Sequence, residues 1–291
     1  MQVVYHIGAP GTDDDLLLGS LLKNRAALAR QNIIVPPPTR YRTVVRDTGN
    51  ALEGRPANDE VQAALIDAIV DEHRIDRLIL SDPRFICINR LVVQGPQIWP
   101  MIDRKAAQLR GLFPSAEVEF FIGMRDPATL IPELWKTSKI SDFEEFTANM
   151  QPHAVAWSEM LRRLRNALPG CPVTVWCNED TPLLWGEILR EMAAIGADMP
   201  LDGEDDLVET IMDPEGFDRL RAYLRDTPPE TEMQRRRIVA AFLDRYARED
   251  AIEEELDLPG WTEELMADLT ESYENDMEVI ARLPGVTLLA P

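Results

Sequence analysis

The sequence is poor in cysteine, in histidine and in long apolar runs. It has 3 cysteines and 3 histidines in 291 residues. Cys87, Cys171 and Cys177 lack the spacing of metal ligands, and such a sparse, odd count is typical of reduced thiols in a cytoplasmic protein. No stretch reaches the roughly 18 apolar residues of a membrane span, and the N-terminus lacks the pattern of a signal peptide. We therefore expect a cytoplasmic protein with no membrane span and no metal site.

Positive charge is also scarce. The chain has 30 Lys and Arg against 51 Asp and Glu, a net charge of −21, and a sequence pI of about 4.5. This balance argues against nucleic-acid or anionic-membrane partners, because both require a basic face. The excess acid is uneven, since residues 201–291 hold 25 Asp and Glu against 9 Arg.

Short apolar segments alternate with segments of helical periodicity over the first 200 residues. This alternation predicts a mostly parallel sheet covered by helices on both faces, a three-layer α/β/α fold. The polar segment from Thr39 to Pro56 is predicted as a loop, and Ser141 to Asn149 as a helix with Ser141 as its N-cap. The predicted strands are Val3–Ile7, Ile33–Val35, Arg77–Ser81, Glu117–Met124 and Val173–Cys177.

No strand is predicted from Asp202 onward. Helical patterns cover Gly216 to Leu224, Glu230 to Ala247 and Thr262 to Leu283, separated by acidic joints that contain proline. We expect an α/β core over residues 1–200 and an acidic helical C-terminal extension over 201–291, packed on the core.

A glycine-containing turn joins the first predicted strand to the first predicted helix. Gly8, Pro10 and Gly11 form the turn, and Thr12 with Asp13 to Asp15 would begin a helix that continues to about Arg30. A strand, a glycine turn and a helix N-terminus together aim free N–H groups at one point and are typical of phosphate-binding loops. Three carboxylates are unusual at such a site.

The turn and a second motif resemble the bacterial sulfotransferases. The opening shares His6-Ile7-Gly8-Ala9-Pro10 and Asn24-Arg25-Ala26-Ala27-Leu28 with that family, and Arg125-Asp126-Pro127 follows a strand as in its second motif. Tyr273-Glu274-Asn275-Asp276 resembles the Tyr-x-x-Asp close of many members. The resemblance implies a P-loop-like fold and the donor 3′-phosphoadenosine-5′-phosphosulfate (PAPS). It places Gly8, Gly11, Thr12 and Arg125 at the donor contacts.

The departures from the family pattern fall on those donor contacts. Gly11 stands at the position of the family's lysine, and Asp13 to Asp15 replace a Gly-Thr-Thr segment. Glu133 stands where the family has a serine that contacts the donor's 3′-phosphate. Each carboxylate near a donor phosphate would be repulsive by about 1 kcal/mol or more.

Several roles remain open from the sequence. Asp13 to Asp15 could cap the helix, hold a divalent cation or tolerate PAPS. His6 could be a satisfied buried histidine or a general base, and Arg125 an anion contact or the ion-pair partner of Asp126 or Glu133. Arg40, Arg42 and Arg46 could lie on a solvated loop or face the cleft. Trp157, Trp176 and Trp185 are expected in the core. No catalytic residue can be assigned.

The functional hypothesis is a sulfotransferase-like pseudoenzyme with a degraded PAPS-binding loop. The alternative is an active sulfotransferase that uses PAPS with altered donor contacts, and would therefore also bind the desulfonated product, 3′-phosphoadenosine-5′-phosphate (PAP). A third possibility is a binding or scaffold protein that uses the cleft for a cation, a partner protein or a different small-molecule ligand. The acceptor, the oligomeric state and any physiological partner are not defined by the sequence.

Overall fold

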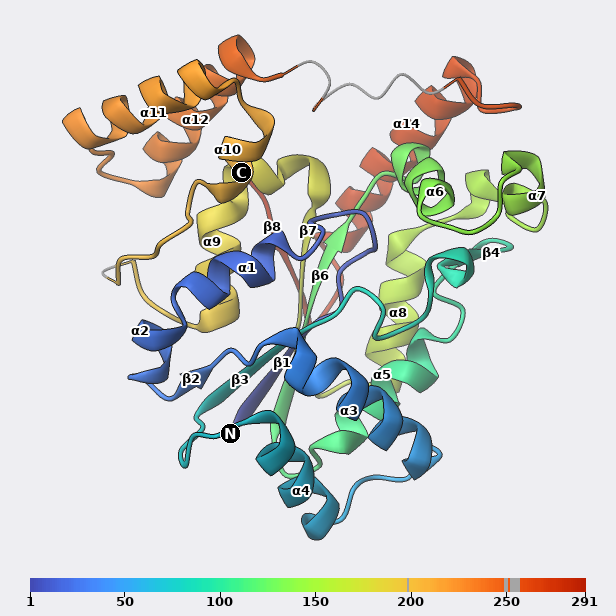
Figure 1. Ribbon diagram of the computed structural model, residues 1–291. Coiled ribbons are helices and arrows are strands. Elements are labelled where there is room, and N and C mark those ends of the chain that lie inside the picture. Colours follow the sequence, from blue (N-terminus) through green and yellow to red (C-terminus); the bar gives the residue numbers. More distant parts are fainter. Residues whose placement is uncertain (198, 249–250, 252–256) are drawn as a thin grey trace.

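A single parallel sheet of six strands organises the protein. The computed structural model describes residues 1–197, 199–248, 251 and 257–291. The strand order is β2-β3-β1-β6-β7-β8, and every neighbouring pair is parallel (Figure 1). The strands are β1 (Gln2–His6), β2 (Ile33–Ile34), β3 (Arg77–Ser81), β6 (Glu117–Met124), β7 (Val173–Cys177) and β8 (Val286–Leu289), while β4 (Val93–Gln94) and β5 (Gln97–Ile98) form a separate hairpin.

Helices cover both faces of the sheet, as the sequence predicts. Alternate residues of β1 point to opposite faces, Tyr5 into one core and Val4 into the other. The face that contains Val4 is covered by α1 (Leu16–Lys23) and α9 (Thr181–Ala193). The Tyr5 face is covered by α3 (Pro38–Leu52), α4 (Asp59–Ile69), α5 (Ile102–Leu112), α6 (Pro127–Lys136), α8 (Trp157–Ala167) and α14 (Glu263–Ile280).

The segment predicted as a loop at Thr39–Pro56 is largely helical, so that prediction is wrong. Helix α3 begins with Pro38 in its first turn, where the missing N–H has no cost. Tyr41, Val45 and Gly49 recur every four residues and form its buried face. Three apolar positions were enough for a helix because the core supplies the packing, while the polar residues lie on the outer face.

The expectation that no strand follows Asp202 is also wrong. Strand β8 pairs in parallel with β7, with Leu288 opposite Val175, and completes the edge of the sheet. It is only four residues long and follows Pro284-Gly285 near the chain end, so periodicity alone could not reveal it. The division at residue 200 remains a prediction, but β8 and α14 pack with the elements of the predicted core.

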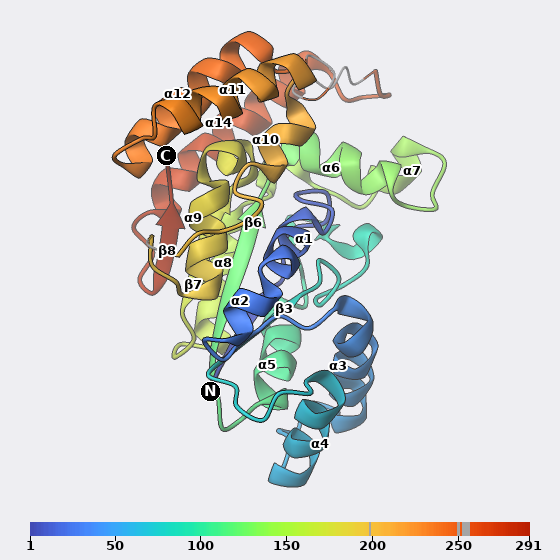
Figure 2. The same ribbon diagram turned by 60° about the vertical axis from the view of Figure 1, so that its left-hand side comes forward.

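Three further C-terminal helices form a cluster of their own. Helices α10 (Asp206–Ile211), α11 (Pro214–Asp226) and α12 (Glu232–Tyr246) enclose a small apolar core. Figure 2 shows them stacked beyond α9, at the end of the molecule where the strands terminate. The buried carboxylate of Asp206 joins this cluster to α1, because it accepts hydrogen bonds from Ser20 and from Lys23 Nζ, the latter at 2.6 Å.

Smaller differences concern helix ends. The predicted helix at Ser141 is the short α7 (Phe143–Thr147), and its N-cap is Asp142, whose carboxylate accepts from Glu145 N. The first helix ends at Lys23, and a separate α2 (Arg25–Ala29) follows. Among the described residues no helix is long and apolar enough to cross a membrane.

Candidate functional site

The candidate site lies at the carboxyl end of β1. Strand β1 continues into α1 on one face of the sheet, while its neighbours β3 and β6 continue into α5 and α6 on the other. In open parallel sheets, helices that diverge in this way leave a crevice beyond the strand ends, and ligands bind there. The glycine turn and the motif at Arg125 both lie at this end.

The turn after β1 keeps a backbone suited to close ligand approach. Gly8 and Gly11 have φ of +32° and +78°, a region that glycine adopts without steric cost. Ala9 N donates to Gly123 O at 3.1 Å, so the turn is held against β6. Thr12 Oγ1 donates to Ala9 O at 2.7 Å and therefore closes the turn on itself. Three of the predicted contact residues, Gly8, Gly11 and Thr12, thus belong to one tight loop.

The first helix begins later than predicted, because the two residues before it are not helical. Asp14 and Asp15 have left-handed backbone conformations, with φ of 47° and 66°, and α1 starts only at Leu16. The half-buried Asp13 side chain accepts from Leu17 N at 3.1 Å. A carboxylate of the chain therefore occupies a donor at the helix N-terminus, where an anionic ligand is otherwise favoured.

Asp15 forms a second internal pair. Arg42 on α3 donates from Nη1 to Asp15 Oδ2 at 2.8 Å and from Nη2 to Asp15 Oδ1 at 2.5 Å. It also donates to Ser81 O at the end of β3. Of the three arginines predicted near this region, Arg42 alone reaches the turn, while Arg40 pairs with Asp71 and Arg46 with its neighbour Asp47. A bidentate guanidinium that could hold a phosphate is thus engaged by Asp15.

Arg125 also lies against the turn. Its Nη1 donates to Gly11 O at 2.5 Å and its Nε to Thr129 Oγ1 at 3.0 Å. The Glu133 side chain covers the turn as well, since a Cβ placed on Gly11 would lie 2.4 Å from Glu133 Cγ. The two departures at Gly11 and Glu133 are therefore coupled, because the glutamate fills the space that a longer residue 11 would need.

A network of hydrogen bonds supports the second motif. Asp126 caps α6 by accepting from Ala128 N, and its other oxygen accepts from Thr270 Oγ1 at 2.6 Å. Glu179 accepts from Asp126 N and from Tyr273 Oη, both at 3.0 Å, and its burial raises its pKa. Sequence reasoning missed Glu179, although its partner Tyr273 belongs to the Tyr-x-x-Asp motif. This network holds the backbone that carries Arg125.

His6 lies beneath the turn and is almost fully buried. Its Nδ1 is 2.9 Å from Ser81 Oγ, whereas Nε2 has no hydrogen-bond partner in the described part of the chain. Burial lowers the pKa of His6, while Asp13 and then Asp15 act in the opposite direction. Burial raises the pKa of Asp13, and His6 partly offsets this. The folded protein therefore favours the neutral form of the His6 imidazole, which lies under the loop.

The free energy of unfolding is expected to fall as pH drops through the ordinary histidine pKa of 6.5. Below this pH, His6 binds a proton in the unfolded chain but stays neutral in the folded protein. This difference lowers the free energy of unfolding by about 1 kcal/mol between pH 7.5 and 5.5. Urea denaturation of His6→Gln should show a flatter pH dependence, while the exposed His73→Gln should match the wild type.

Asp13 opposes this effect, because its raised pKa favours the folded state as pH falls. The Asp13→Asn variant should therefore show a steeper loss of stability than the wild type. If the free energy of unfolding of His6→Gln depends on pH as steeply as that of the wild type, the pH dependence does not come from His6.

The remaining predicted residues are structural. Trp157, Trp176 and Trp185 are 0%, 3% and 1% exposed, which confirms their place in the core. The three cysteines are unpaired thiols, and burial raises the pKa of each. Within the described residues no group of His, Cys, Asp or Glu side chains could hold a metal ion, so the acids of the turn do not converge as cation ligands.

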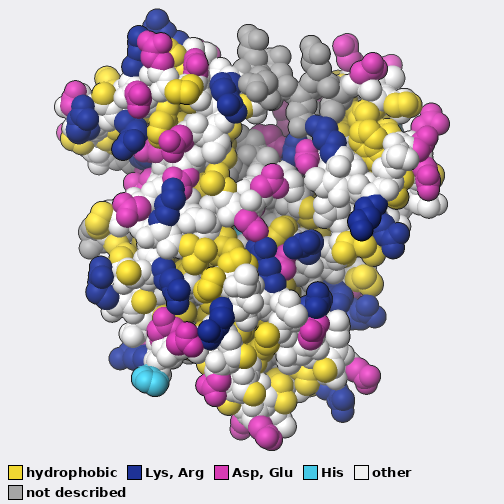
Figure 3. Space-filling model, viewed as in Figure 1, with side chains coloured by type: hydrophobic (Ala, Val, Ile, Leu, Met, Phe, Trp, Pro, Cys, Tyr) yellow, Lys and Arg dark blue, Asp and Glu magenta, His cyan; other side chains and the backbone are white. Residues whose placement is uncertain are grey.

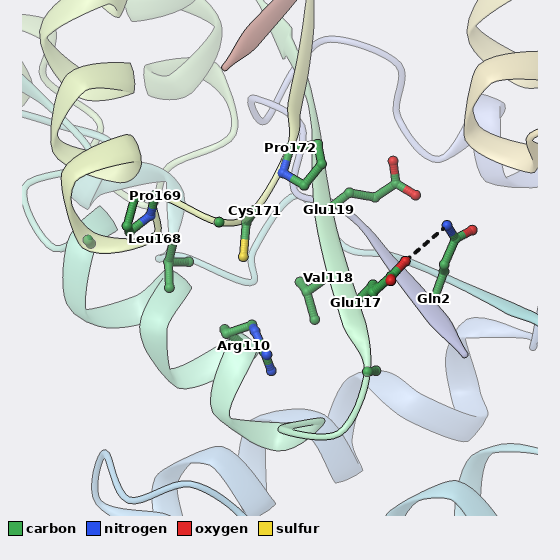
Figure 4. A pocket seen from close by; sticks show the side chains of 12 residues that line it. Gln2, Arg110, Glu117, Val118, Glu119, Leu168, Pro169, Cys171 and Pro172 are labelled. Atoms are coloured by element: carbon green, nitrogen blue, oxygen red, sulfur yellow. Dashed lines mark hydrogen bonds between the residues drawn. The ribbon is translucent and has the colours of Figure 1, made fainter. Parts of the chain in front are cut away.

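Another cavity lies away from the turn, at the amino ends of β1, β6 and β7. It has a volume of about 470 Å³ and is lined by residues such as Arg110, Val118 and Cys171 (Figure 4). Figure 4 shows Glu117 extended toward Gln2, whose Nε2 is 3.4 Å from Glu117 Oε2. Because ligand crevices in parallel sheets form at the carboxyl ends, this cavity is not the candidate site.

Comparisons with known proteins are sparse. No family model matches the chain, and no curated protein matches it. A crystal structure of a sulfotransferase from Alicyclobacillus acidocaldarius is similar over 89% of this chain and 97% of that chain, with 13% identity and a TM-score of 0.38. A structural similarity with a TM-score this low carries no argument about this protein. The resemblance to sulfotransferases therefore rests on the sequence motifs and on the site described above.

Proposed function

We propose that this is a sulfotransferase-like protein whose donor loop no longer binds PAPS in the ordinary manner. The backbone of the loop is kept, but acidic side chains of the chain engage the groups that a donor phosphate would need. The proposal includes the expected cytoplasmic location and the absence of ordinary sulfuryl-transfer activity.

The bidentate pair between Arg42 and Asp15 carries this proposal. A donor phosphate would have to displace a carboxylate held at 2.8 and 2.5 Å and would meet Asp13 at the helix N-terminus. It would also meet Glu133, which covers Gly11. Each unfavourable charge contact is worth about 1 kcal/mol in water and about 4 kcal/mol near a protein surface at close range.

Titration calorimetry with PAP tests the proposal directly. We expect no binding tighter than a Kd of about 0.1 mM, which corresponds to about −5.5 kcal/mol. The control is a sulfotransferase with an intact lysine loop, titrated in the same buffer. Binding in the micromolar range would overturn the proposal.

The second candidate is an active sulfotransferase with altered donor contacts. It is favoured by the N–H groups of Asp13, Asp14 and Asp15, which donate no hydrogen bond to any described residue. Arg125 also keeps the position of the family's arginine beside the turn. Micromolar PAP binding that Arg125→Ala abolishes would support this candidate over the first.

A further inference from the structure

A second cavity opens between α3 and α5, beside the candidate site. Its volume is about 300 Å³, at the lower end of the range for small-molecule sites. Val45, Leu109 and Leu112 supply buried apolar side chains, and the half-buried Phe85 lies among them. The cavity adjoins the carboxyl end of β3 through Asp82, the edge where ligands of parallel sheets bind.

Four cationic side chains line this cavity, in a chain with a net charge of −21. On the face shown in Figure 3, lysine and arginine side chains lie scattered among acidic ones. Three of the four cavity cations have carboxylates near them: Arg42 contacts Asp15 and Asp82, Arg46 contacts Asp47, and Arg84 lies 3.8 Å from Asp82.

Lys105 is the exception. Its half-buried side chain reaches Gln108 Oε1 at 3.2 Å, but no carboxylate of a described residue lies within 4.0 Å of its Nζ. Burial lowers the pKa of Lys105, and the neighbouring Arg104 acts in the same direction. A partly desolvated ammonium without a counter-charge gains from an anion placed beside it.

We propose that this cavity binds a small organic monoanion, a carboxylate or sulfonate carried on an aromatic body, with Lys105 as its main charged contact. Four cations beside three carboxylates leave a surplus of one positive charge, which suits a monoanion better than a phosphate dianion. The apolar side chains suit a flat ring system, because burial of apolar surface supplies most of the affinity of such ligands. This inference goes beyond the proposed function and does not depend on whether the loop binds PAPS.

The test uses 2-naphthoate as the probe, in titration calorimetry of the full chain. The neutral 2-naphthamide has nearly the same shape, and acetate has the charge without the ring. We expect naphthoate to bind at least about tenfold more tightly than the amide, and acetate to show no heat of binding. Equal affinity for naphthoate and the amide would overturn the proposed role of charge.

Two variants locate the bound anion. Lys105→Gln keeps a polar side chain of similar length and should reduce naphthoate affinity to that of the amide. Lys139→Gln, at an exposed position outside the cavity lining, should leave it unchanged. The thermal midpoint of both variants should match the wild type, and unaltered naphthoate binding by folded Lys105→Gln would overturn the assignment. Competition by PAP would overturn it as well, since the cavity would then be part of the donor site.

Discussion

A protein with three substitutions in the turn and one at Glu133, whose side chain covers the turn, is expected to bind PAP at least about 100-fold more tightly than the wild type. This is a gain of about 2.7 kcal/mol. The changes are Gly11→Lys, Asp13→Gly, Asp14→Thr and Glu133→Ser. They add one cation at the family's lysine position and remove three carboxylates, each repulsive by about 1 kcal/mol or more at close range.

The matched control omits Glu133→Ser. A Cβ on residue 11 would lie 2.4 Å from Glu133 Cγ, so the glutamate side chain would have to move before a lysine could fit. The left-handed backbone at Gly11 adds a cost of roughly 1–2 kcal/mol for any residue with a Cβ, and this cost is the same in both proteins, so the two differ only at Glu133. We therefore expect the three-change protein to gain much less affinity.

Calorimetry on both proteins, after circular dichroism has shown that they are folded, separates the possibilities. If the three-change protein binds PAP as well as the four-change protein, Glu133 does not cover the site. If neither binds, the prediction is wrong, because an added lysine and the loss of three carboxylates would then not restore binding while Asp15 still engages Arg42.

Arg77→Leu is expected to destabilise the protein by about 3–5 kcal/mol. The Arg77 side chain on β3 is only 6% exposed, and its Nη1 lies 2.6 Å from Glu119 Oε1. It also donates from Nε to Met192 O at 2.7 Å, near the end of α9. Its removal leaves the Glu119 carboxylate, which is 20% exposed, and the Met192 carbonyl without their donor, and this penalty adds to the loss of the contacts themselves.

Urea denaturation measures the effect, with Arg74→Leu as the control. Arg74 carries the same charge a few residues earlier but is 75% exposed, and exposed ion pairs contribute about 0–1 kcal/mol. A loss below 1 kcal/mol in Arg77→Leu would show that solvent replaces its partners, and that the amino edge of the sheet is wetter than the structure indicates.

Much of the fold could be predicted from local sequence because the relevant signals are local. The strands β3, β6 and β7 coincide with the predicted apolar runs, since both faces of a parallel sheet are buried and each strand reads as nearly continuous apolar sequence. The predictions were wrong at α3 and β8, where the pattern of apolar residues in the sequence is weak. Both elements form because they pack against distant parts of the chain.

The candidate site divides in the same way. A glycine turn after the first strand, acids in place of the expected lysine and hydroxyls, and an arginine after a later strand could all be identified from local residue order. The contacts of those residues could not, because they join segments that are distant in the chain. Arg42 meets Asp15 across 27 residues, and Glu133 covers Gly11 from α6. Such pairings depend on which helices the sheet brings together, because contacts between distant segments are set by the packing of whole elements rather than by local residue pattern.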